Sequence, residues 1–135
     1  MATFQKIDSF VENLAEKLID LSGATLTIAL TNTAHTATWD ELADLTQISY
    51  TNLSSRVITV SSSAQTSGTY KLVCADLVLT ASGAVGPFRY VYIYDDGSTG
   101  DKLIAYYDYG SSITLANGDT FTIDFDATNG VLTIA

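Results

Sequence analysis

The stretch that decides the fold is FRYVYIYDDGSTGDKLIAYYDY, residues 88–109. Both of its ends are rich in aromatic and β-branched residues, which favour strands, and its middle holds the Asp and Gly residues of a turn. We therefore predict a β-hairpin in which strands 88–94 and 103–109 flank a turn at 95–101. Alternation places aromatic rings on one face of the first strand: Phe88, Tyr90, Tyr92 and Tyr94.

Short strands continue on both sides of this hairpin. Residues 26–30 alternate between apolar and polar, as in a half-buried strand, and residues 69–80 are apolar on both faces, as inside a sheet. Further strands are predicted at 57–60, 113–115, 120–125 and 131–134, with loops at 32–37, 50–55 and 61–68. Asn117-Gly118 predicts a second hairpin, between 113–115 and 120–125. The pattern predicts a mostly β chain, an antiparallel β-sandwich or barrel-like domain of about seven strands.

The N-terminal segment has a different period. Between Phe4 and Leu21 the apolar residues recur at helical spacing, with Thr3 as a candidate N-cap and Gly23 as a stop. We expect an amphipathic helix over residues 1–23, packed on the β-domain of residues 24–135 or on a neighbouring subunit. The residues expected at this interface are Phe4, Ile7, Phe10, Val11, Leu14 and Leu18.

Two further helical features are expected. Acidic residues follow one another at i,i+4 on the polar half of the first helix, forming a ridge that weakens an isolated helix: Asp8, Glu12, Glu16 and Asp20. This ridge is either a solvated face or a contact with a basic surface. Thr38 and Glu41 have the spacing of a capping box, which predicts a short second helix through Asp44.

Composition bounds the class of protein. The chain has 135 residues, of which 47% are apolar and 16% charged, as expected of one folded domain. Its net charge is −9, and its six basic residues are dispersed, which disfavours nucleic acid and anionic membrane surfaces as partners. No secretory signal or membrane-spanning stretch is visible, so we expect synthesis in a cytoplasm.

The sequence predicts no enzyme and no cofactor. The single histidine, His35, lies among small loop residues without a paired nucleophile, and Cys74 lies in an apolar run typical of an inert buried thiol. One histidine and one cysteine do not make a zinc site. Asp95, Asp96 and Asp101 offer oxygen ligands that calcium prefers, but the same residues are ordinary in a turn, which is the favoured interpretation.

The tyrosines leave three interpretations open. Tyr90, Tyr92 and Tyr94 share one face of their strand, and the opposite strand adds Tyr106, Tyr107 and Tyr109. Such a cluster can be core, a protein interface or a platform on which sugars stack. Core combined with interface is the favoured interpretation.

Several segments together resemble small virion proteins of tailed bacteriophages. They cover nearly the whole chain: 30–34 (LTNTA), 42–48 (LADLTQI), 68–73 (GTYKLV), 86–90 (GPFRY), 108–112 (DYGSS) and 125–132 (FDATNGVL). Residues 50–55 (YTNLSS) depart from the resemblance, which would have a glycine-rich turn there. These strings are structural rather than catalytic.

The resemblance implies a virion protein, above all a capsid decoration (cement) protein that binds the outer head surface and stabilises the shell. Its implied partners are the major capsid protein and further copies of itself. A tail component, either tube or tip, is the alternative, and a glycan-binding module using Tyr90, Tyr92, Tyr94 and the tyrosines of 106–109 is a third.

Overall fold

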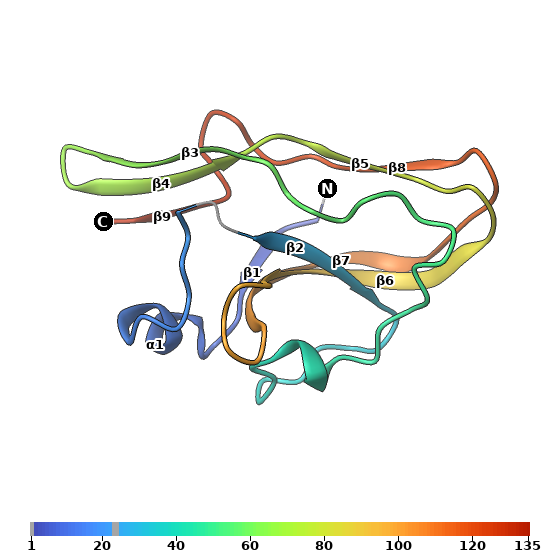
Figure 1. The fold of residues 1–135 in the computed structure, drawn as a ribbon, viewed down its shortest axis with the longest axis horizontal. Coiled ribbons are helices and arrows are strands. Elements are labelled where there is room, and N and C mark those ends of the chain that lie inside the picture. Colours follow the sequence, from blue (N-terminus) through green and yellow to red (C-terminus); the bar gives the residue numbers. More distant parts are fainter. Residues whose placement is uncertain (1, 23–24) are drawn as a thin grey trace.

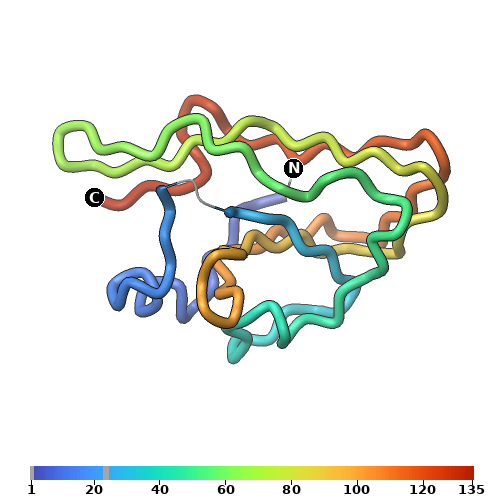
Figure 2. The backbone as a smooth tube through the Cα atoms, viewed as in Figure 1, coloured from blue at the N-terminus to red at the C-terminus, as the bar shows by residue number. Residues whose placement is uncertain are grey.

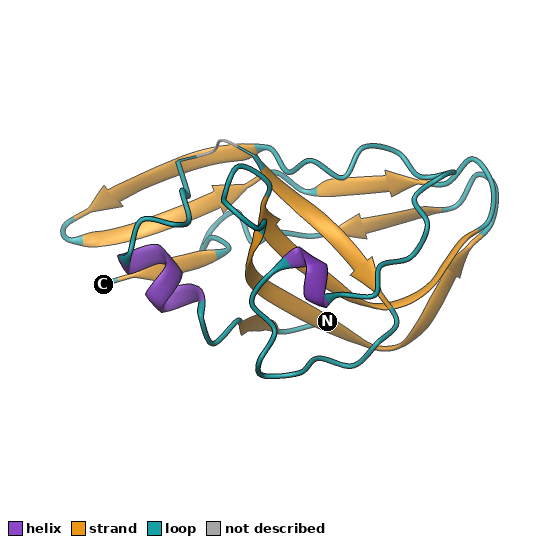
Figure 3. Ribbon diagram, turned by 60° about the horizontal axis from the view of Figure 1, so that its bottom comes forward, coloured by secondary structure: helices purple, strands orange, loops and turns teal. Residues whose placement is uncertain are grey.

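The computed structural model describes residues 2–22 and 25–135, which are mostly β with antiparallel sheets, as the sequence predicts. The described residues contain nine strands: β1 (Phe4–Lys6), β2 (Leu26–Thr31), β3 (Val60–Thr66), β4 (Thr69–Cys74), β5 (Leu77–Thr80), β6 (Val85–Asp95), β7 (Lys102–Leu115), β8 (Thr120–Ile123) and β9 (Leu132–Ile134). They also contain the helix α1 (Phe10–Ala15) and the 3-10 helix η1 (Leu42–Asp44). Figure 3 shows how small the helical part is beside the strands.

The strands lie in two layers (Figure 1). One layer is a four-stranded antiparallel sheet in the order β1-β7-β6-β2. The other holds the three-stranded sheet β3-β4-β9 and, beside it, the two-stranded sheet β5-β8. The backbone trace crosses between the layers, so segments distant in sequence become neighbours (Figure 2).

The four-stranded sheet is covered on both faces. On the face toward the other layer, the ring of Tyr109 packs edge-on against Phe121 of β8. On the opposite face, Tyr92 packs against Trp39, which belongs to the long connection between β2 and β3. All six residues of β2 are buried, so the half-buried strand expected at 26–30 is fully buried instead.

The predicted N-terminal helix over Phe4–Leu21 is wrong. Phe4 begins a strand that pairs with β7 opposite Tyr107, and α1 starts only after Ser9, so Thr3 does not cap it. The helix has six residues, and Lys17 follows it with a left-handed φ of 67°. Gly23, the expected stop, lies outside the described residues. The N-terminal segment is thus built into the β-domain rather than appended to it.

The acidic ridge is therefore not continuous. Glu12 lies on α1, Glu16 is its C-cap, and Asp8 and Asp20 fall outside the helix. All four side chains are exposed to solvent. The short second helix is η1, but its reciprocal capping box joins Glu41 and Asp44 rather than Thr38 and Glu41.

Two further predictions, for residues 61–68 and 69–80, differ from the structure because the local sequence pattern does not show which strand each segment pairs with. The predicted loop at 61–68 is mostly β3, an exposed strand of small polar residues that pairs with β4. The single strand expected at 69–80 divides into β4 and β5, which belong to different sheets. A run of apolar residues shows burial, but it does not show that the chain changes sheets part-way.

The two predicted hairpins have opposite outcomes. The hairpin at 88–109 is confirmed, with Tyr92 opposite Tyr106 and Asp95 opposite Lys102. The hairpin at Asn117-Gly118 is wrong, because β8 pairs with β5 rather than with β7. Neither helical segment in the described residues is long and apolar enough to span a membrane.

Candidate functional site

An open apolar hollow lies between α1, β1 and β9, and we call it the α1 groove. Its volume is about 660 Å³. It is lined by Phe4, Lys6, Phe10, Val11, Leu14, Ala15, Val131, Leu132, Thr133 and Ile134. Val11 and Ile134 are 54% and 41% exposed, which is unusual for large apolar side chains gathered in one place. Such a surface is typical of a protein interaction site.

The groove is built by β1 and α1 from the N-terminal part of the chain and by β9 from its C-terminal part. β1 holds Phe4 at the edge of the four-stranded sheet, where its ring meets Tyr107 edge-on at 6.0 Å. The chain then turns at the buried Ile7 and enters α1, whose Phe10 faces the core and whose Val11 faces solvent. β9 supplies the other wall by pairing with β4, with Ile134 opposite Tyr70.

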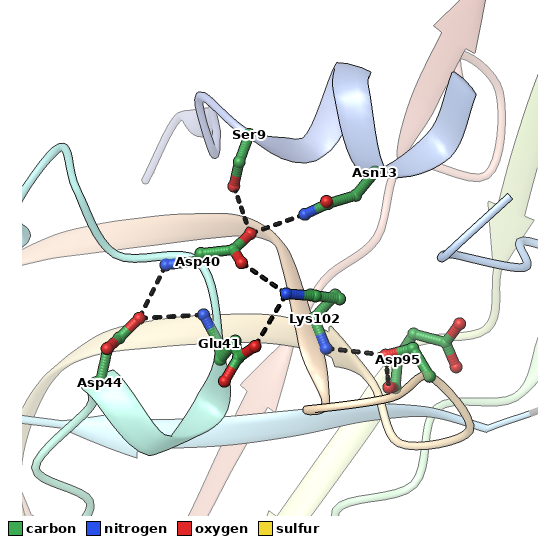
Figure 4. A network of polar contacts seen from close by, with 8 residues as sticks. Ser9, Asn13, Asp40, Glu41, Asp44, Asp95 and Lys102 are labelled. Carbon is green, nitrogen blue, oxygen red and sulfur yellow. Dashed lines mark hydrogen bonds and ion pairs between the residues drawn. The ribbon is translucent and has the colours of Figure 1, made fainter. Parts of the chain in front are cut away.

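A polar network fastens α1 to the body of the protein (Figure 4). The Asp40 carboxylate accepts hydrogen bonds from the Ser9 hydroxyl and the Asn13 amide, both at 2.6 Å. Lys102 Nζ lies 2.5 Å from Asp40 Oδ2 and 2.8 Å from Glu41 Oε1. The network therefore joins the helix, the 32–48 connection and the start of β7, and it fixes one wall of the groove.

The charges in this network stabilise one another. Burial alone would raise the pKa of Asp40, but the hydrogen bonds from Lys102, Ser9 and Asn13 and the charge of Lys102 hold that pKa below its ordinary value. Hydrogen bonds to Asp40 and Glu41 raise the pKa of Lys102. Both groups are charged at neutral pH, as an ion pair requires.

The aspartates considered as weak calcium candidates lie at the end of β6 and in the turn between β6 and β7. Asp95 is buried, and its carboxylate accepts hydrogen bonds from the backbone N–H groups of Asp20 at 2.9 Å and Gly97 at 3.0 Å. Burial and the nearby charges of Asp96, Asp95 and Glu41 raise the pKa of Asp101. The described residues contain no group of three or more His, Cys, Asp or Glu side chains arranged to hold a metal ion. The aspartates of this hairpin serve as turn residues.

His35 belongs to an aromatic cluster on the outer face of the four-stranded sheet. Its Nδ1 lies 2.9 Å from the Tyr92 hydroxyl, and its ring stacks on Tyr106 at 4.3 Å. Trp39 closes the cluster with an edge-on contact at 5.7 Å to His35. Burial lowers the pKa of His35, so the imidazole is neutral at pH 7 and is used in packing.

The tyrosines do not form one platform. Tyr90, Tyr92 and Tyr94 are all less than 10% exposed. Tyr106 stacks with Tyr92 on the outer face of the sheet, whereas Tyr109 packs against Phe121 on the inner face. A set of exposed, coplanar rings, which the glycan-binding interpretation requires, is not formed by these residues.

Cys74 is buried in the core at the end of β4. Burial raises the pKa of its thiol to about 11, so the reactive thiolate is scarce at neutral pH. This agrees with the interpretation of Cys74 as an inert core residue.

The structure brings together four of the nine residues predicted for an interface, whereas Tyr90, Tyr92 and Tyr94 are buried in the sheet. The four line the α1 groove: Phe4, Phe10, Val11 and Leu14. Leu18 is 40% exposed but lies outside the lining, and Ile7 is fully buried in the core. The groove wall formed by β9 was missed, because a three-residue strand near the C-terminus carries no signal that it lies beside the N-terminal helix.

Comparison with known proteins gives one result: no protein-family model, curated protein or solved structure matches the chain. The binding properties of the groove are therefore argued from the residues that line it. Apolar walls of this kind suit an apolar segment, and charges beside them favour oppositely charged residues next to that segment. Residues 4–22 contribute Asp8, Glu12, Glu16 and Asp20 against Lys6 and Lys17, so this segment is acidic overall, although the charged residue in the groove lining itself is Lys6.

Proposed function

We propose that the chain is a structural protein of a tailed-bacteriophage particle, a capsid decoration protein that binds the outer head surface through the α1 groove. The observation that carries this proposal is the apolar lining of the groove, in which Val11 and Ile134 are exposed. The resemblance of segments along most of the chain to small phage virion proteins supports the choice of a phage particle as the place where this surface binds.

Charge supports a basic partner surface. The chain carries a net charge of −9, and the helix beside the groove contributes to it through Glu12 and Glu16. An acidic decoration protein is attracted to basic patches on a shell protein and is repelled by packaged DNA. The proposed partner is therefore the major capsid protein, through an apolar segment flanked by basic residues.

Binding to particles tests the proposal. Val11→Asp and Ile134→Asp place a charge in the groove at exposed positions, so the variants fold, and we expect particle binding to weaken by about tenfold or more. Val78→Asp is the matched control, because Val78 is 50% exposed on β5, away from the groove, and should bind normally. Cosedimentation with purified heads that lack the chain measures the three affinities.

Image reconstruction of the native particle locates the chain. Density on the outer head surface, with the α1 groove against the shell, is the expected result. Density confined to the tail would assign the chain to the tail tube or tip instead. Equal binding of all three variants would overturn the role of the groove.

A further inference from the structure

The outer edge of β3 is an open strand edge. β3 is the terminal strand of the order β3-β4-β9, and it has one paired neighbour among the described residues. With seven residues it is longer than the other outer strands of the three sheets. Apart from a register shift between Val60 and Ser62, it carries none of the usual protection of an edge, because 60–66 (VSSSAQT) contains no charge and no proline.

The turn beyond β3 determines which backbone groups point outward. Thr66 and Thr69 are paired across a two-residue turn, Ser67-Gly68, in which both residues have positive φ. The flanking pair of such a turn is hydrogen-bonded, and antiparallel pairs alternate along the ladder. Ala64 therefore directs its N–H and C=O toward β4, whereas Ser63 and Gln65 direct theirs to the open edge.

The neighbouring open edges are shorter or covered. The edge of β2 is occupied by residues 47 and 57, which form bridges to Thr31 and Thr27. β5 is partly covered, since Ser54 donates its N–H to the Thr80 carbonyl. The outer part of β7 contains an irregular stretch near Gly110, whose N–H is already bonded to the Asp108 carboxylate.

We infer that β3 pairs antiparallel with β3 of a second copy of this chain, about a two-fold axis at Ala64. In this arrangement Ser63 of each copy is hydrogen-bonded to Gln65 of the other, and the small Ala64 side chains meet at the axis. The two three-stranded sheets then join into one continuous sheet, β9-β4-β3-β3-β4-β9. This inference concerns self-association and does not depend on the particle to which the chain belongs.

Charge identifies a second copy as the occupant. Between Arg56 and Asp76 the chain has a single charged residue, Lys71, although the whole chain carries 15 acidic and six basic residues. The β3–β4 hairpin also extends beyond the rest of the molecule, so it is the part through which two acidic copies approach with least repulsion (Figures 1 and 2).

Lys71 does not oppose the pairing. It lies on β4 opposite Ala64, so the two copies of Lys71 are separated by three strand spacings, roughly 14 Å. That distance exceeds the screening length of about 8 Å at physiological ionic strength. The edge itself is neutral, and the hollow lined by Ser62, Ala64 and Thr66 is walled by small, mostly polar residues rather than by the apolar pockets with which a sheet edge selects a foreign peptide.

A cysteine placed on the axis tests the geometry. Ala64 is exposed, so Ala64→Cys should fold and, under mild oxidation, should form a disulfide-linked dimer with itself. Thr122→Cys is the matched control, because Thr122 is exposed on the edge strand β8 and should remain monomeric. The unmodified chain, whose Cys74 is buried, should also remain uncrosslinked.

A charge at the same position tests the association itself. Ala64→Lys should abolish the dimer measured by sedimentation velocity, whereas Thr122→Lys should leave it unchanged. A dimer that survives Ala64→Lys, or an Ala64→Cys variant that does not crosslink, would overturn the inference. Crosslinking of Ala64→Cys only to a shell protein in reconstituted particles would assign the edge to a foreign strand and equally overturn it.

These results are separable from the proposed function. Val11→Asp and Ile134→Asp alter the groove and should leave the Ala64→Cys crosslink intact. Failure of particle binding with an intact crosslink would reject the decoration role alone, and the reverse result would reject strand pairing alone.

Discussion

Asp40 is the residue on which the polar network beside α1 converges (Figure 4). It accepts hydrogen bonds from Ser9 and Asn13 and pairs with Lys102, which connects three segments that are far apart in sequence. Asp40→Asn keeps the shape but removes the charge, so we expect the free energy of unfolding at pH 7 to fall by about 1–2 kcal/mol. Urea unfolding measures this, and Asp124→Asn is the control because Asp124 is exposed.

The same variant should differ in its dependence on pH. Because the pKa of Asp40 is lowered in the folded protein, its stabilising contribution is present above the ordinary value of 3.8 and is lost as the pH falls through the folded value. The unmodified protein and Asp40→Asn should therefore converge in stability as the pH falls below 3.8 and passes through the folded value. A constant difference between them down to that pH would show that the charge of Asp40 does not act as described.

Sequence reasoning could find single residues but not their partners. Cys74 was assigned correctly because an apolar run is a local signal. His35 and Tyr92 are 57 positions apart, and Asp40 and Lys102 are 62 apart, so no spacing rule connects them. The spacing predicts a capping box at Thr38 and Glu41, but the reciprocal hydrogen bonds join Glu41 and Asp44, where an acidic residue takes the place of the usual Ser or Thr.

At the scale of elements, the N-terminal helix shows how tertiary pairing overrides periodicity. The apolar spacing over 4–21 fits a helix, but the buried side chains are held by different structures. Phe4 belongs to a strand on the edge of β7, Phe10 to α1, and Ile19 and Leu21 to the extended chain after Lys17. Helices gain most of their stability from packing rather than from their own backbone. Residues that can pair with the edge of a sheet therefore form a strand there instead of lengthening the helix.

The two sides of α1 should respond differently to truncation. Phe10 is 4% exposed and Val11 is 54% exposed, although they are adjacent. Phe10→Ala should lower the free energy of unfolding by about 3 kcal/mol or more through loss of buried area and a cavity. Val11→Ala should change it by no more than about 0.5 kcal/mol, as for other exposed positions.

Chemical denaturation of both variants measures the difference. A large loss of stability in Val11→Ala, or none in Phe10→Ala, would mean that α1 packs with the opposite face. Because Val11 lines the groove without supporting the fold, its variants report on binding rather than on stability.

A hairpin could be predicted from the sequence where the two strands that flank the turn also pair with each other in the sheet. Residues 88–109 combine strand-forming ends with a turn of Asp and Gly, and their nearest partner in sequence is also their partner in the sheet. Asn117-Gly118 has equally strong turn chemistry, but Gly118 donates its N–H to the carbonyl of Ala81. That contact aligns β8 with β5. At this turn the chain therefore passes from the sheet of β7 to the other layer instead of closing a hairpin.

At the scale of the whole molecule, charge is distributed unevenly between the two proposed interfaces. The exposed Glu12 and Glu16 lie on α1 and at its end, beside the α1 groove, whose own lining carries Lys6. The β3 strand has no charged residue in 60–66. Attraction between the acidic helix segment beside the groove and a basic partner loses strength as salt screens it. Pairing of neutral backbone between two copies, each with a net charge of −9, gains strength because salt screens their repulsion.

The two interfaces should therefore have opposite salt dependence. On raising sodium chloride from about 50 mM to about 500 mM, the screening length falls from roughly 14 Å to roughly 4 Å. We expect the association constant of the dimer, measured by sedimentation, to rise severalfold, while the affinity for particles, measured by cosedimentation, falls. Ala64→Lys should remove the first response without changing the second. A dimer that dissociates with added salt would instead be held by opposite charges, which the β3 edge does not possess.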